Sequence, residues 1–67
     1  MVEESRIAFS DRLLRLPEVK TRVGMSRSTI YRYVNDGLFP RPRRLGLAAI
    51  AWNESDIVHW IANRPST

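Results

Sequence analysis

The sequence predicts one small, mainly helical α+β domain that combines three short helices with a two-stranded β-hairpin. Its 67 residues leave room for a single hydrophobic core. Hydrophobic residues make up 43% of the chain and charged residues 27%, which are ordinary proportions for a globular domain. Proline, glycine and capping residues divide positions 12–64 into short segments, and we expect positions 1–11 to form a flexible arm before this domain.

The first helix is expected over positions 17–23. Pro17 suits the first helical position, where its missing N–H costs nothing, and Gly24 stops the run of helical residues. Positions 12–16 are expected to be extended, because a proline disfavours helical geometry in the residue before it.

The second helix is expected over positions 27–36, between the N-cap Ser26 and a left-handed Gly37. The next residues, Leu38 and Phe39, are expected to fold back over the core. Helical periodicity places Ile30, Tyr33 and Val34 on the buried face. The same periodicity leaves a polar face exposed, consisting of Arg27, Ser28, Tyr31, Arg32 and Asn35.

The hairpin is expected after Pro42, with its turn near positions 46–48 and its second strand at 49–52. A last helix should follow the N-cap Asn53 and end near Asn63. Its buried stripe is predicted to consist of Ile57, Trp60 and Ile61. Both tryptophans, Trp52 and Trp60, are interpreted as core residues and not as base-stacking residues.

Positive charge is concentrated in the middle of the chain. The net charge is +4, but positions 20–44 carry +6 and each flank carries −1. Ten of the eleven basic residues are arginine, whose planar guanidinium matches phosphate groups and guanine edges. This bias favours nucleic acid as the partner.

The first two helices are short and are joined at positions 24–26, and the second is basic on its outer face. This is the pattern of a helix-turn-helix, in which the hairpin would be the wing. In that motif the second helix enters the major groove of double-stranded DNA. We expect this helix to read bases and the flanking cations to bind phosphates. The predicted base-reading residues are Arg27, Ser28, Tyr31 and Arg32, and the predicted phosphate ligands are Lys20, Arg22, Arg41, Arg43 and Arg44.

Four blocks of sequence resemble the AlpA family of prophage regulators, in the order found in that family. The blocks lie at 12–19, 23–32, 37–42 and 52–61, and the likeness extends over positions 12–64. The resemblance implies a winged helix-turn-helix related to the MerR and excisionase group. It also implies control of excision genes or direct help to an integrase, and it adds Thr29 to the recognition helix.

One departure from the family and several alternatives stay open. The family usually has polar or basic residues at the wing turn, whereas Leu47, Ala48 and Ala49 are apolar here, so that this tip could contact sugars or another protomer. The function could be transcriptional regulation through RNA polymerase, or excision through an integrase, on DNA bound by single protomers, a homodimer or a cooperative array. The rival from another class is a protein-interaction module.

Enzymatic and cofactor-dependent classes are disfavoured. The chain has no cysteine and a single histidine, His59, and no nucleophile is paired with a base. We therefore expect no catalytic residue, no metal and no cofactor. The absence of a long apolar run and the acidic first residues predict a cytoplasmic protein.

Overall fold

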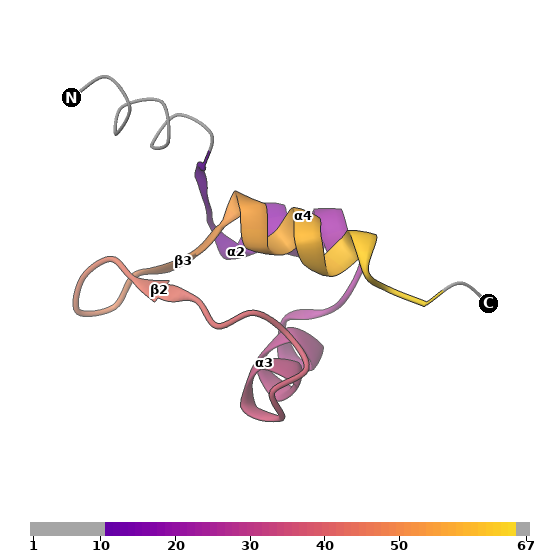
Figure 1. Ribbon diagram of the computed structural model, residues 1–67. Coiled ribbons are helices and arrows are strands. Elements are labelled where there is room, and N and C mark those ends of the chain that lie inside the picture. Colours follow the sequence, from indigo (N-terminus) through magenta and orange to yellow (C-terminus); the bar gives the residue numbers. More distant parts are fainter. Residues whose placement is uncertain (1–10, 66–67) are drawn as a thin grey trace, which may run out of the picture.

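The computed structural model describes residues 11–65, and the predicted arm at 1–11 therefore lies outside the described residues except for Asp11. Within this range three helices and three short strands follow one another along the chain (Figure 1). None of these helices has the length and apolar content that crossing a bilayer requires. The elements are β1 (Leu13–Leu14), α2 (Leu16–Val23), α3 (Arg27–Asn35), β2 (Arg43–Arg44), β3 (Ile50–Asn53) and α4 (Glu54–Ala62).

The strands form a three-stranded antiparallel sheet in the order β1-β3-β2. The predicted hairpin is confirmed as β2 and β3, closed by a hydrogen bond from the amide of Leu45 to the carbonyl of Ala49 (2.7 Å). The strand β1 was predicted only as an extended segment. Its Leu14 pairs with Trp52 in β3, and both side chains are fully buried, so that pairing this strand completes the core.

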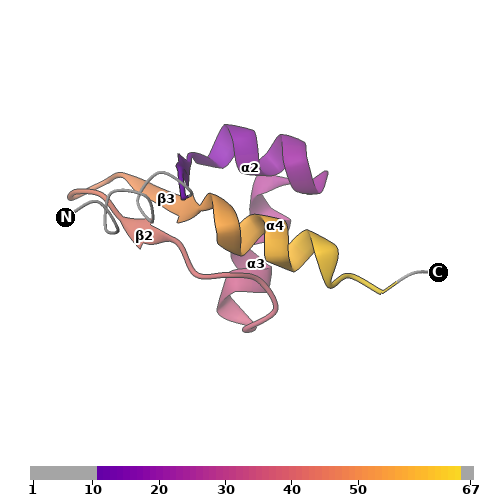
Figure 2. The same cartoon turned by 45° about the horizontal axis from the view of Figure 1, so that its top comes forward.

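Glycines in the left-handed conformation end the first two helices, as predicted. Gly24 has φ 69° and Gly37 has φ 75°, values that favour glycine. After α3, the amide of Leu38 donates to the carbonyl of Tyr33 (2.8 Å), and the amide of Gly37 donates to the carbonyl of Val34 (3.1 Å). These two bonds form a Schellman motif, which turns the chain sharply toward the wing. In Figure 2, α3 runs away from α2 beneath α4.

Every element except β2 contributes to the core. The cluster consists of Leu14, Val19, Ile30, Val34, Phe39, Trp52 and Ile57. Two predicted core residues are exposed: Leu38, at 55% of its surface, and Ile61, at 41%. Leu38 turns its carbonyl inward, where it accepts a hydrogen bond from Trp60, and leaves its side chain in solvent. Ile61 lies in the last turn of α4, beyond Ile57 and Trp60, the two residues of that helix that reach the core.

The two tryptophans hold the segment that connects α3 to the wing. The indole of Trp52 donates to the carbonyl of Pro40 and that of Trp60 donates to the carbonyl of Leu38, both at 2.8 Å. Phe39, between these two carbonyls, packs edge-on against both rings, with centroid distances of 6.2 and 4.8 Å. The structural role predicted for both tryptophans is confirmed.

The N-terminus of α4 is capped from a distant part of the chain. Asn53 occupies the predicted N-cap position, but its side chain makes no capping hydrogen bond. Asn53 is still the last strand residue, paired with Leu13. The carboxylate of Asp11 instead accepts a hydrogen bond from the amide of Ser55 (3.0 Å). The carbonyl of Arg12 accepts one from the amide of Glu54 (2.7 Å). Asp11 is therefore bound to the folded domain.

Candidate nucleic-acid interface

The outer face of α3 carries the predicted base-reading residues, and the helix begins where the sequence indicated. Ser26 is the N-cap, and its hydroxyl accepts from the amide of Thr29 (3.3 Å). Arg27, Ser28 and Arg32 are exposed, and Ser28 and Arg32, four positions apart, share the face opposite to the buried Ile30. The first two turns of the helix thus present two guanidinium groups and a hydroxyl to solvent, which are donors suited to base edges and phosphates.

Two other residues of the predicted recognition helix, Tyr31 from its exposed face and Thr29 from the family resemblance, are only partly accessible. Tyr31 is half-buried and packs against the core, as Tyr33 does, and the guanidinium of Arg27 lies 5.7 Å from the centre of its ring. Thr29 is also half-buried, and its hydroxyl accepts a hydrogen bond from Ser26 at 2.9 Å. A tyrosine that lies under an arginine can orient that arginine by a cation–π interaction. The threonine hydroxyl belongs to the helix cap.

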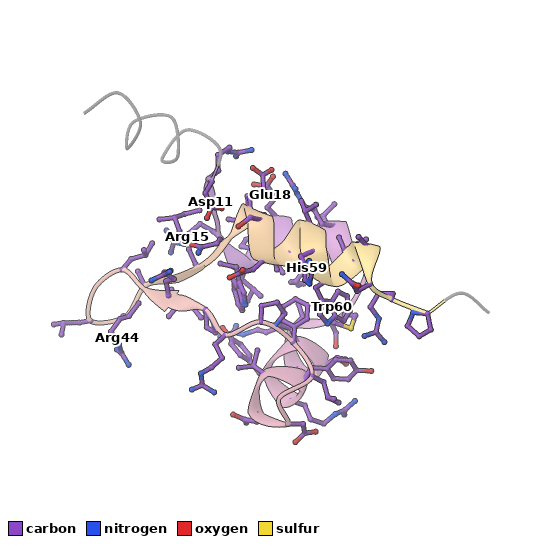
Figure 3. All side chains as sticks on the ribbon, in the orientation of Figure 1. Asp11, Arg15, Glu18, Arg44, His59 and Trp60 are labelled. Carbon is purple, nitrogen blue, oxygen red and sulfur yellow. The ribbon has the colours of Figure 1, made fainter. Side chains whose placement is uncertain are left out.

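The strand register separates the two wing arginines. Arg44 lies opposite Ile50 and Arg43 lies opposite Ala51. Successive side chains of a strand point to opposite faces of the sheet. Ile50 packs against the core, to which α3 contributes Ile30 and Val34, so that Arg44 lies on the core side of the sheet and Arg43 on the other side. Figure 3 shows Arg44 extending from the wing on the side where α3 lies.

On α2 the two predicted phosphate ligands differ in their surroundings. Arg22 makes ion pairs with Glu18 (3.0 Å) and with Glu54 at the start of α4 (2.9 Å). Its hydrogen bonds to Glu18 first and then to Glu54 raise the pKa of the guanidinium further above its ordinary value. Lys20 is exposed and makes no ion pair with any residue from 11 to 65.

Arg12 completes this ion-pair network, which the sequence analysis did not predict. It lies 3.7 Å from Glu18 and 3.8 Å from Glu54, so that two arginines and two glutamates join the start of the domain, α2 and α4. The spacing of Glu18 and Arg22, four positions apart on a helix, was a signal for one pair. The contacts to Glu54 depend on tertiary structure. Arg15 makes a further link, from its Nε to the carbonyl of Ile50 (3.1 Å).

The basic surface consists of six cations from positions 20–44. Six exposed side chains from α2, α3, the connecting segment and β2 make no ion pair with any described residue. Unpaired guanidinium and ammonium groups attract polyanions and can replace the counterions of a phosphate backbone. In the described range, no three His, Asp or Glu side chains come together as metal ligands. The six cations are Lys20, Arg27, Arg32, Arg41, Arg43 and Arg44.

Comparison with known proteins places this chain among phage-related regulators. Residues 12–65 match the family described as prophage CP4-57 regulatory protein (AlpA). The chain is 41% identical over 59 residues to the DNA-binding transcriptional activator AlpA of Escherichia coli (strain K12), an alignment that covers 79% of this chain and 84% of that protein. It is 44% identical over 54 residues to the uncharacterized protein ORF88 of Enterobacteria phage P4, covering 81% of this chain and 61% of the phage protein. No solved structure matches the chain. The chain belongs to the AlpA family of prophage regulatory proteins.

Proposed function

We propose that this protein is a sequence-specific DNA-binding regulator of transcription that serves a prophage or another mobile element. One observation carries the proposal: α3, the second helix of a helix-turn-helix, exposes Arg27, Ser28 and Arg32 on one face amid cations that have no acidic partner. A relative 41% identical is named a DNA-binding transcriptional activator, and this supports the same activity here.

In this proposal α3 lies in the major groove and its exposed face reads base edges. Arginine can bond to guanine O6 and N7 with both branches of its guanidinium, which gives the two α3 arginines the role of specificity. The phosphate ligands are Lys20, Arg41 and Arg44, with Arg43 more peripheral because it lies on the other face of the wing. Arg22 is left out of this set, since two carboxylates occupy its guanidinium. Tyr31 positions Arg27, and Thr29 supports the helix cap by accepting a hydrogen bond from Ser26.

The functional unit is proposed to span positions 12–64, with Asp11 docked on it and positions 1–10 as an arm. It acts by occupying DNA, with no bond made or broken, in the cytoplasm where the host chromosome lies. At a promoter the partner is RNA polymerase, and the name of the E. coli relative favours this partner over an integrase. The protein-interaction rival is disfavoured by the concentration of unpaired positive charge.

The experiment compares two arginine sets on two duplexes. A preferred site is first recovered from a pool of random duplexes by repeated selection with the wild-type protein. Binding of Arg27→Ala, Arg32→Ala and Arg44→Ala is then measured on that site and on a scrambled duplex over a salt series, with circular dichroism to verify folding. Each α3 variant should lose about 1–3 kcal/mol on the selected site and much less on the scrambled duplex.

The wing variant Arg44→Ala should weaken binding to both duplexes equally, because a phosphate contact carries no direct sequence information. Equal losses on the two duplexes for both α3 variants would show that α3 is not the reading element. DNA binding unchanged in all three variants would favour the protein-interaction rival.

A further inference from the structure

A shallow concavity lies between α4 and the segment that follows α3, outside the proposed DNA interface. Its volume is about 350 Å³, and its walls are largely apolar. Two of its residues, Phe39 and Trp60, pack edge-on at 4.8 Å and hold its shape. None of its lining residues belongs to the proposed DNA-contact set. Its lining includes Leu38, Phe39, Pro40, Asp56, His59 and Trp60.

The tip of the wing is a projecting apolar residue with cations beside it. Leu47 is 100% exposed, so that its side chain packs against nothing in the domain. The guanidinium of Arg44 donates to the carbonyl of Leu47 (3.5 Å), which holds a positive charge next to the tip. Figure 3 shows the wing, marked by Arg44, at one end of the molecule and the concavity, marked by His59 and Trp60, away from it.

We propose that the wing tip of one protomer inserts Leu47 into this concavity of a second copy, so that copies bound side by side on DNA form a head-to-tail array. The fit is steric and electrostatic. The concavity is at the lower end of the range for small-ligand pockets, about 300–1,000 Å³, and holds an isobutyl group. Asp56 at its rim is an exposed carboxylate that makes no ion pair with residues 11–65, and it complements the arginines beside the tip.

The two surfaces differ, and each protomer carries one of each. A contact of this kind is heterologous and leaves a free tip at one end and a free concavity at the other, so that it extends as an array instead of closing as a dimer. A single side chain in a pocket buries far less than the roughly 1,200 Å² of a stable interface. The inference therefore rests on the proposed function, since DNA must bring the copies together and raise their effective concentration.

A copy of this chain suits the tip better than the alternatives. Insertion of Leu47 between base pairs would cost a few kcal/mol of unstacking, which is recovered only where the DNA bends to contact more of the protein. The concavity is already formed and already carries a carboxylate suited to the basic wing. Both halves of the contact therefore exist on the same chain, and no unknown partner is needed.

Cross-linking tests the contact directly, because the chain contains no cysteine. Leu47→Cys and Leu38→Cys are prepared separately and together and are treated with a short bismaleimide, with and without a mixed-sequence duplex. We expect the mixture of single variants to yield a heterodimer and the double variant to yield a DNA-dependent ladder. Leu47→Cys with Val58→Cys, another exposed position outside the concavity, should yield no ladder. Cross-linking mainly between two Leu47→Cys tips would overturn the head-to-tail arrangement.

Cooperativity of DNA binding provides the second test. Binding is compared on a duplex of about 15 base pairs, roughly one and a half turns that hold one protomer, and on one of about 60 base pairs. Leu47→Ser and Leu38→Ser should each lower the cooperativity on the long duplex roughly tenfold, the effect of losing the burial of one leucine side chain. Affinity for the short duplex should change no more than in the matched control Val58→Ser. An equimolar mixture of the two variants should regain pairwise cooperativity, since one tip and one concavity remain intact.

The outcomes separate the array from the proposed function. The array would be overturned if the wild-type protein bound both duplexes without cooperativity and the double cysteine variant gave no ladder. DNA binding would then remain in place. A loss of short-duplex affinity confined to Leu47→Ser, with cooperativity retained, would place the tip on DNA and would also overturn the array. An absence of wild-type binding to either duplex would overturn the proposed function and the array with it.

Discussion

Replacement of Asp11 by alanine should destabilise the domain, although Asp11 lies 44 positions from the residue that it caps. Its carboxylate accepts from the amide of Ser55 at the N-terminus of α4 (3.0 Å). Loss of such a side-chain cap costs about 1 kcal/mol, and loss of a negative charge at a helix N-terminus costs about 0.3–1 kcal/mol more. We expect Asp11→Ala to lower the free energy of unfolding by about 1.5 kcal/mol, a decrease of roughly 6–12 °C in Tm for a domain of this size.

Thermal and urea unfolding followed by circular dichroism measure this effect, and two variants serve as controls. Asn53→Ala removes the side chain that the sequence assigns to the cap, and it should cost less than about 0.5 kcal/mol because that side chain makes no capping bond. Asp11→Asn keeps an acceptor oxygen and loses the charge, so that its effect should lie between wild type and Asp11→Ala. A larger loss in Asn53→Ala than in Asp11→Ala would refute the assignment of the cap to Asp11.

Three further predictions concern the helix-turn-helix and its cations. Ser26→Ala should lower the free energy of unfolding by about 1 kcal/mol through the lost cap of α3. Ser28→Ala should leave Tm nearly unchanged and weaken DNA binding. A larger loss of Tm in Ser28→Ala than in Ser26→Ala would contradict the observed helix start. Lys20→Gln should make the slope of log affinity against log salt shallower by about one, and Arg22→Gln should leave it unchanged, because the ion pairs to Glu18 and Glu54 already occupy Arg22. In the same titrations on a scrambled duplex, Arg44→Ala should reduce affinity more than Arg43→Ala, and equal losses would contradict the facial assignment drawn from the strand register.

Local signals predicted the elements well because the interactions behind them are local. Pro17, Gly24, Ser26 and Gly37 act through their own backbone geometry or through bonds to residues within four positions, and the helices begin and end within one or two positions of the expected ones. The exposed face of α3 also follows from periodicity alone.

The features that the sequence did not predict depend on contacts between distant segments. Pairing of Leu14 with Trp52 forms the strand β1, and Asp11 lies next to the N-terminus of α4 only because β1 pairs with β3. The role of Arg22 is set by Glu54, which lies 32 positions away in the chain. The sequence predicted Arg22 as a phosphate ligand because nothing distinguishes the arginines of positions 20–44 until their neighbours in space are known.

The structure divides the chain into a scaffold and an interface, and this division explains why the interface can be rigid. The six unpaired cations of the basic surface lie on positions 20–44, which also supply Ile30, Val34 and Phe39 to the core, while Leu14, Trp52, Ile57 and Trp60 come from the flanks. The two tryptophans of the second flank hold the carbonyls of Leu38 and Pro40, and through them they fix the segment between α3 and the wing. The guanidinium groups on α3 and β2 are thus placed relative to one another before DNA arrives, so that binding orders little backbone and loses little conformational entropy. Substitutions on the exposed face of α3 therefore change binding without removing core contacts, whereas substitution of either tryptophan disturbs the spacing between helix and wing even though neither belongs to the proposed DNA contacts.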